Sequence, residues 1–228
     1  MATYLIHCST KRFWYVKELL IPSMLKQGIQ QQDILIYNDK NGIGNLRAWV
    51  DSCNRLSLHC KHHDIDGVWH LQDDVVISKN FKRLTEKYDT GLVCGFTCAY
   101  DKKPEPGHFH LYQHKMWFSF PCIRIPSDIL LEFTNWANIN LWQSKYFRSC
   151  VRANNADDLV FREWLYDSHV DMEHLNLAPN LINHVDKLIG GSLANPQRDK
   201  EQDTMSIFWD EQDVIDDLIS QLKKVKKF

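Results

Sequence analysis

Two adjacent acidic residues, Asp73 and Asp74, come just after the apolar run GVWHL at 67–71, which predicts a buried strand. Adjacent carboxylates at the end of a buried strand repel one another unless a cation neutralises them. Oxygen ligands suit hard cations such as Mg²⁺ or Mn²⁺, which can bridge a protein and a diphosphate. An isolated Asp-Asp pair is more often a solvated turn, but its place after a third strand favours a metal site.

A second acidic pair, Asp157 and Asp158, opens a predicted helix over 157–166. Acids at a helix start can simply cap it, because they satisfy free N–H groups there. A carboxylate at this position can also take the proton from a hydroxyl that attacks a substrate. The sequence leaves both interpretations open.

A late histidine, His184, lies in the segment PNLINH, and Gly190, Gly191 and Ser192 follow it. A lone histidine is more often structural than a ligand. The Gly-Gly-Ser run can let backbone N–H groups approach a phosphate, although it is also a common turn sequence.

The elements that must position these residues alternate along the first third of the chain. Apolar runs predict strands at 3–8, 33–37 and 67–71, and helical spacing predicts helices at 13–26, with Pro22 as a kink or break, and at 43–56. This order indicates an α/β fold with a parallel sheet flanked by helices. Ligands bind beyond the carboxyl ends of such strands, so the loops 9–12, 38–44 and 72–74 should converge on one cleft.

The rest of the chain continues the pattern less regularly. We expect helices at 81–88 and 128–137, strands at 91–99 and 118–125, and a polar linker at 195–204. An amphipathic helix over 215–225 closes the chain, with Ile215, Leu218, Leu222 and Val225 on one stripe. We therefore predict a domain at 1–194, then a linker and helix at 195–228; this helix can dock on the domain, form a homodimer or touch a membrane surface.

Composition sets limits on partners and compartment. The 228 residues carry a net charge of −2, which weakens a duplex-DNA interpretation, since DNA binding normally needs a basic face. No apolar stretch approaches the roughly 20 residues that span a bilayer, and the N-terminus does not resemble a signal peptide. Seven cysteines without a CxxC pair fit free thiols. We expect a soluble, intracellular, cytoplasmic protein.

Taken in order, the motifs resemble those of nucleotide-sugar-dependent glycosyltransferases with the GT-A fold. The motifs are STKR, ILIYNDKNGIGN, GVWHLQDDVVIS, NNADDLVFREWL and PNLINHVDKLIGGSL, which together cover residues 3 to 194. Each motif alone is weak, and their order and spacing carry the resemblance. It implies a GT-A-like (Rossmann-like), mostly parallel sheet flanked by helices.

The resemblance also implies roles for individual residues. Asp74 and His184 would hold a divalent metal, and imidazole suits Mn²⁺ better than Mg²⁺. Gln72 stands where the family often has an acid, which leaves the number of protein ligands and strict metal dependence open. The nucleotide-sugar donor, usually a UDP-sugar in this fold, would contact Ser9, Thr10, Arg12, Asp39, Asp73, Gly191 and Ser192.

The implied reaction is transfer of a sugar to an acceptor hydroxyl, with Asp158 as the catalytic base and Asp157 as the helix cap. Use of a base implies inversion at the anomeric carbon, although the sequence is also compatible with a retaining enzyme. The acceptor can be a hydroxymethylated DNA base, a glycan or a protein.

Three alternatives compete with this hypothesis. A nucleotidyltransferase usually has a glycine-rich loop after the first strand, whereas the loop here, CSTKR, has no glycine. A non-catalytic module that binds a nucleotide or sugar would explain Gln72. A zinc site is less favoured, because the spacing fits no common structural finger in the group Cys53, His59, Cys60, His62 and His63.

Overall fold

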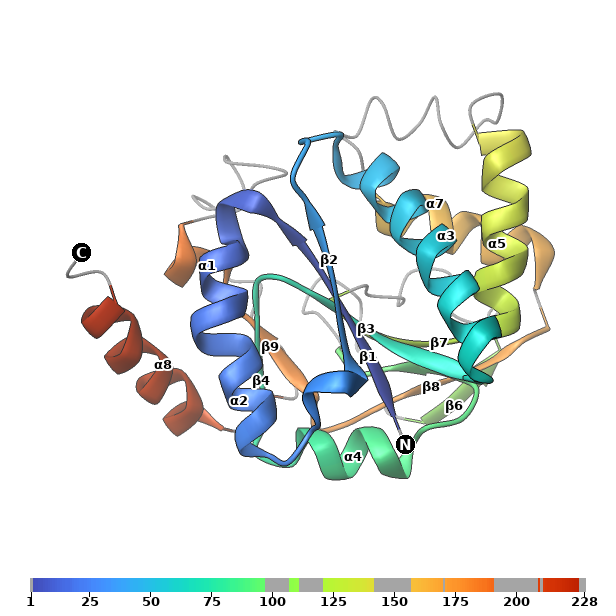
Figure 1. The fold of residues 1–228 in the computed structure, drawn as a ribbon. Helices are drawn as coiled ribbons and strands as arrows, with labels where there is room; N and C mark the ends of the chain where they lie inside the picture. The colour runs from blue at the N-terminus through green and yellow to red at the C-terminus, as the bar shows by residue number, and fades with distance from the viewer. Residues whose placement is uncertain are drawn as a thin grey trace.

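A computed structural model describes residues 2–96, 107–110, 121–141, 157–169, 171–190, 209 and 211–225. The protein has a mixed α/β fold. Its central sheet has seven strands in the order β2-β1-β3-β7-β5-β8-β6, and helices cover both faces (Figure 1). The predicted α/β class is therefore confirmed.

The first three strands form the parallel half of the sheet, as predicted. They are β1 (Thr3–Ser9), β2 (Ile34–Asp39) and β3 (Gly67–Gln72), and β1 lies in the middle. Ser9 is paired with Asp39 and His7 with Gln72, so all three strands end at the same edge of the sheet. The next residues along each strand, which are polar, therefore meet at that edge.

The other half of the sheet is mixed. The strand β7 (Cys122–Pro126) runs antiparallel to β3 and to β5 (Leu92–Cys94), while β8 (Glu173–Asn176) is parallel to β5 and antiparallel to β6 (Gly107–His110). Five of the seven strands, β1, β2, β3, β5 and β8, thus point the same way. The predicted strand at 91–99 is shorter than expected, and 97–106 lies outside the described residues.

Helices lie on both faces of the sheet (Figure 1), and an apolar cluster on each face holds them there. On one face, α3 (Asn45–His63), α5 (Ser127–Asn140) and α7 (Asp157–Ser168) bury a cluster that includes Trp49, Phe133 and Phe161. The rings of Phe133 and Phe161 pack edge to face, with their centroids 4.9 Å apart. The other face carries the long helix α8 (Gln212–Val225) and several shorter segments. The shorter segments are η1 (Thr10–Arg12), α1 (Phe13–Tyr15), η2 (Val16–Leu20), α2 (Ile21–Lys26), α4 (Phe81–Lys87) and η6 (Asp186–Ile189).

The predicted helix at 13–26 is a run of helical turns. A π-helical turn, η2, precedes Pro22, which occupies the first turn of α2. Proline has no N–H to donate, so a change of helical hydrogen bonding around it is expected. The helix α3 is longer than predicted and extends to His63, where Asp64 adopts a left-handed conformation with φ of 54°.

A two-stranded antiparallel sheet lies beside the main one and was not predicted. It pairs β4 (Val75–Ile77) with β9 (Ile182–His184), and Val75 lies opposite His184. Because β4 begins directly after Asp74, this pairing brings the late histidine to the acidic pair.

The start of β3 is held by a buried arginine. Arg124 in β7 is 1% exposed, and its guanidinium group donates to Asp66, to Asp89 and to the carbonyl of Gly91. It lies against Gly67, where a Cβ atom would come within 2.6 Å of the guanidinium. The glycine thus leaves room for a charged group that ties the starts of β3 and β5 together.

The terminal helix α8 packs on the chain itself. Ile215, Leu218 and Leu222 are buried in the same cluster as β4, so the stripe that suggested a homodimer is covered from within the chain. The proposed division at 194 and 195 is not tested, and the predicted linker lies outside the described residues. In the part of the chain that is described, no helix is long and apolar enough to cross a membrane.

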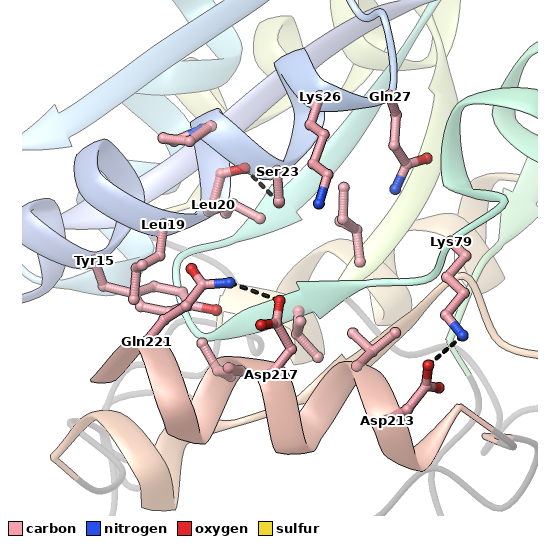
Figure 2. Close-up of a pocket in the computed structure, with 15 residues that line it drawn as sticks. Tyr15, Leu19, Leu20, Ser23, Lys26, Gln27, Lys79, Asp213, Asp217 and Gln221 are labelled. Carbon is pink, nitrogen blue, oxygen red and sulfur yellow. Dashed lines mark hydrogen bonds and ion pairs between the residues drawn. The ribbon is translucent and has the colours of Figure 1, made fainter. Parts of the chain in front are cut away.

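Between α2 and α8 lies a cavity of about 530 Å³. Figure 2 shows Leu19 and Leu20 on one side of it, Asp213 and Asp217 on the other, and Lys79 pairing with Asp213 at the rim. Tyr15 also lines this cavity, and its hydroxyl donates to the carbonyl of Val75 (2.8 Å). The acidic pair does not line it, so the cavity is separate from the site described next.

Candidate active site

The three polar loops converge as the sequence predicted. Thr10 after β1 reaches the end of β2, where its hydroxyl donates to the carbonyl of Asp39 (2.9 Å) and lies 3.3 Å from Oδ1 of Asn38. Ser9 and Arg12 reach the other way, to the acidic pair after β3. One short segment, 9–12, thus connects both neighbouring strand ends.

The acidic pair is buried, since Asp73 and Asp74 are each 7% exposed. Oδ2 of Asp73 accepts the backbone N–H of Ser9 (2.7 Å) and its hydroxyl (3.1 Å). Nη1 of Arg12 lies 3.0 Å from Oδ1 of Asp73 and also contacts Oδ2 of Asp74. Buried adjacent carboxylates need positive charge nearby, and in this structure Arg12 supplies it.

His184 contacts Asp74 at the carboxylate oxygen that Arg12 does not contact. Its Nε2 lies 3.2 Å from Oδ1 of Asp74, and its Nδ1 lies 3.4 Å from Oδ1 of Asp186. The backbone also joins these segments, because the N–H of Val185 donates to the carbonyl of Asp74 (2.8 Å). The imidazole therefore lies between two carboxylates.

These contacts set the protonation states. Burial alone would lower the pKa of His184, but Asp74 and Asp186 outweigh it and raise the pKa to about 10. Burial opposes ionisation of Asp74, yet His184 and Arg12 hold its pKa well below the ordinary range. The pKa of Asp73 is raised, because burial and the charge of Asp74 outweigh Arg12 and Ser9. Near neutral pH the imidazole is a cation.

The raised pKa of His184 predicts a pH dependence of stability in the metal-free protein. The folded-state pKa of about 10 lies above the ordinary 6.5, so this stabilisation is complete below pH 6.5 and is lost as pH rises toward 10. We expect the free energy of unfolding to fall by an amount on the order of a few kcal/mol across that window. Urea denaturation with a chelator present, between pH 6 and pH 8.5, would measure the onset of the decline.

The matched control for that prediction is His184→Gln, which keeps a polar side chain but cannot titrate. Its stability should start lower and vary much less over the same pH range. A decline of equal slope in both proteins would show that another group causes it.

The donor types at the pair suit a divalent cation. Oδ1 of Asp74 and Nε2 of His184 are 3.2 Å apart, and neighbouring ligands of an octahedral ion with bonds of about 2.1 Å lie about 3 Å apart. Asp186 faces the other imidazole nitrogen, and among the described residues no set of three or more His, Cys, Asp or Glu is arranged around a common point. A metal would thus have Asp74 and His184 as ligands, would replace the imidazole proton and would repel Arg12, which contacts the other oxygen of Asp74.

The structure places the other predicted residues less completely. Asp39 is the half-buried last residue of β2, and its Oδ1 accepts the N–H of Ile43 (3.1 Å). Asp157 and Asp158 are the first residues of α7, and their side chains lie outside the described part of the chain. Gly191 and Ser192 also lie outside it, while Gly190 follows η6 with φ of 121°.

Chain topology nevertheless gives the edge at which α7 starts. The helix leads into β8, which runs parallel to β5 and ends at the same edge as β3. The end of α7 must therefore lie near the opposite edge, and its start near the acidic pair's edge (Figure 1). Asp157 and Asp158 thus approach the site edge from the α3 face of the sheet.

Two residues of the site were missed in the sequence. Asp186 binds the far side of His184, and the spacing His-x-Asp is a signal that could have suggested it. Tyr15 fixes the strand after the acidic pair through Val75 and carries no such signal, because it reads as one more apolar residue of a helix. Cys53 and Cys60, considered for zinc, are buried in the core.

The sequence matches no protein-family model and no curated protein. Among solved structures, it is similar to A197 from STIV, with 14% identity, a TM-score of 0.43, and 79% of this chain and 83% of that chain covered. It is also similar to a glycosyltransferase involved in the glycosylation of the major capsid of PBCV-1, with 10% identity, a TM-score of 0.44 and coverage of 94% and 99%. A Bacillus anthracis protein assigned as a glucose-1-phosphate thymidylyltransferase, in complex with sucrose, gives 9% identity, a TM-score of 0.42 and coverage of 89% and 97%. TM-scores below 0.5 at such identities do not show a shared function.

Proposed function

We propose that the protein is a GT-A-type glycosyltransferase that moves a sugar from a nucleotide-sugar, with UDP as the carrier, to an acceptor hydroxyl. The observation that supports this most is that the segment 9–12 joins the buried acidic pair on one side and the end of β2 on the other, at the carboxyl edge of the parallel strands. Ligands bind at that edge in open α/β sheets. A buried cluster of charges there costs stability, which points to a functional reason for it.

The donor would lie across the end of β1. Ser9, Thr10 and Arg12 offer two hydroxyls and a guanidinium to the nucleotide and its diphosphate, as hydroxyl and arginine donors suit phosphate oxygens. Asp39 at the end of β2 would accept a bond from the base or ribose. Asp73 would approach the ribose or sugar.

Asp74 and His184 would hold a divalent cation, Mn²⁺ or Mg²⁺. When bound, such an ion supplies positive charge to the diphosphate that leaves. The residues of the chain have to keep His184 oriented for this, and Asp186 does so by accepting from the other ring nitrogen.

In the transfer itself, the acceptor oxygen forms a bond to the anomeric carbon while the bond from that carbon to the diphosphate oxygen breaks. The leaving nucleotide takes the electron pair, and Asp158 takes the acceptor proton as general base. Attack from the face opposite the leaving group inverts the anomeric centre. Acceptor classes that fit a hydroxyl nucleophile are a hydroxymethylated DNA base, a glycan and a protein.

The competing assignments predict different behaviour at the same site. A nucleotidyltransferase would consume a nucleoside triphosphate and release pyrophosphate, but the first loop, Ser9 to Arg12, has no glycine to wrap a triphosphate. A non-catalytic module would bind UDP or the sugar without turnover.

Release of UDP from a panel of UDP-sugars tests these assignments together. We expect release with Mn²⁺ that a chelator abolishes, and that rises when an acceptor of the right class is added: hydroxymethylated duplex DNA, oligosaccharide or protein. Tight UDP binding without release from any sugar would instead indicate a binding module. Pyrophosphate release from a triphosphate and a sugar phosphate would indicate the nucleotidyltransferase.

A further inference from the structure

Arg12 differs from its neighbours in the first loop. Thr10 and Lys11 are exposed, whereas Arg12 is 5% exposed and its side chain turns inward toward β3. A buried guanidinium requires anionic partners at all times, because an unpaired buried charge is strongly destabilising. Any change at the site must therefore keep an anion beside Arg12.

Three of the four carboxylate oxygens of the acidic pair accept hydrogen bonds from Ser9 or Arg12. Oδ2 of Asp73 accepts hydrogen bonds from the backbone N–H and the hydroxyl of Ser9. Nη1 of Arg12 contacts both Oδ1 of Asp73 and Oδ2 of Asp74. The remaining oxygen, Oδ1 of Asp74, faces His184. A single guanidinium nitrogen thus contacts both carboxylates, as a bridging metal ion would.

From this arrangement, and on the basis of the function proposed above, we propose that Arg12 exchanges anions during the cycle. In the donor-free protein it neutralises Asp73 and Asp74 and keeps a metal off the pair. When the donor binds, the guanidinium moves to the diphosphate, which frees Asp74 for the metal. Arg12 is then a residue that couples donor binding to metal binding.

The chemistry of the groups supports such an exchange. Arginine binds carboxylate and phosphate with the same planar set of N–H donors, so the diphosphate can replace the pair without leaving the charge unpaired. Arg12 is three residues from Ser9, at the sheet edge where the donor would lie. A metal between Asp74 and His184 would lie at Oδ1 of Asp74, while Arg12 contacts Oδ2 of the same carboxylate. The two cations would repel one another at this short range, so their binding to the pair would be competitive.

Binding measurements without turnover test the exchange. Mn²⁺ binding to the donor-free protein would be measured by electron paramagnetic resonance, and UDP binding by calorimetry, for the wild type and for Arg12→Gln. We expect Arg12→Gln to bind Mn²⁺ on the order of 10- to 100-fold more tightly than the wild type, because the competing cation is gone. We expect its UDP affinity to fall by a similar factor, because a charged hydrogen-bonding group is lost. Near-ultraviolet circular dichroism would confirm that each variant is folded.

Two further variants sharpen the result. Arg12→Lys keeps the charge, so Mn²⁺ affinity should stay within about 3-fold of the wild type while UDP binding still weakens, because lysine lacks the planar fork. Lys11→Gln removes the same charge from the exposed neighbouring position and should change neither affinity by more than about 2-fold. The lysine variant also serves if Arg12→Gln fails to fold.

The outcomes distinguish failure of the Arg12 exchange from failure of the proposed transferase function. The exchange is overturned if the wild type and Arg12→Gln bind Mn²⁺ with equal affinity. It is also overturned if neither protein binds Mn²⁺. Unchanged UDP affinity in both Arg12 variants overturns it as well, while the proposed transferase function would survive. A wild type that binds no UDP, with or without Mn²⁺, would overturn both.

Discussion

Replacement of Asp74 by asparagine is expected to reduce sugar transfer by about 10²- to 10³-fold, the usual loss when a charge-stabilising group at a reaction centre is removed. Asp74 faces His184 through one oxygen and Arg12 through the other, so it links the two cations of the site. Asparagine keeps the shape but loses the charge and one acceptor oxygen. Initial rates of UDP release with Mn²⁺ and an acceptor would measure the effect.

The substitution also affects stability, which has to be separated from catalysis. Removing one partner from a buried ion pair costs about 3–5 kcal/mol, although Asp73 and Asp186 remain to neutralise Arg12 and His184. Rates are therefore compared only where denaturation curves show the variant fully folded.

Asp64→Asn is a matched control for Asp74→Asn. It removes the same charge at the end of α3, a helix that connects the end of β2 to the start of β3, so Asp64 lies at the opposite edge. Asparagine tolerates the left-handed backbone there. Transfer rates within about 3-fold of each other in Asp74→Asn and Asp64→Asn would contradict a role of the acidic pair in catalysis.

Asp158→Asn should separate binding from chemistry. Loss of a general base costs about 10²- to 10⁴-fold in rate, whereas UDP affinity should stay within about 3-fold, because the base contacts the acceptor and not the nucleotide. Single-turnover transfer assays and UDP calorimetry on the same preparation would measure the two quantities.

The adjacent residue supplies the comparison. Asp157→Asn should lower stability by no more than about 1 kcal/mol, the value of a helix cap, and should leave the transfer rate nearly unchanged. If Asp157 carries the large rate effect instead, the two roles are reversed. If UDP binding falls together with transfer in Asp158→Asn, Asp158 is not acting as a base.

Part of the site could be predicted, because it follows from the apolar pattern of three strands and from their parallel arrangement. Apolar runs gave β1, β2 and β3, and the alternation with helices implied parallel strands that end together. The meeting of Ser9, Thr10 and the acidic pair follows from those two facts alone. In the rest of the main sheet, β5 and β7 could be found in the same way, while β6 and β8 were missed. Strand direction could not be predicted, because periodicity does not distinguish an antiparallel β7 from a parallel one.

Other features lay beyond a sequence pattern. The strands β4 and β9 have three residues each, too few for an alternating pattern to appear, yet they place His184 beside Asp74. The need for a positive charge at the acidic pair could be predicted, but not the group that supplies it. Repulsion within the pair required a cation, but a metal ion and an arginine side chain satisfy that requirement equally, and only the fold shows that Arg12 is within reach.

The bridging arginine has a consequence for how the protein is made. Arg12 precedes Asp73 by 61 residues and lies just after β1, the strand that pairs directly with β3, whereas His184 comes more than a hundred residues after Asp74. Because a ribosome delivers the N-terminal part first, the emerging chain holds its neutralising arginine before the two aspartates leave the exit tunnel. β1 to β3 can assemble around a balanced charge while the histidine is still untranslated.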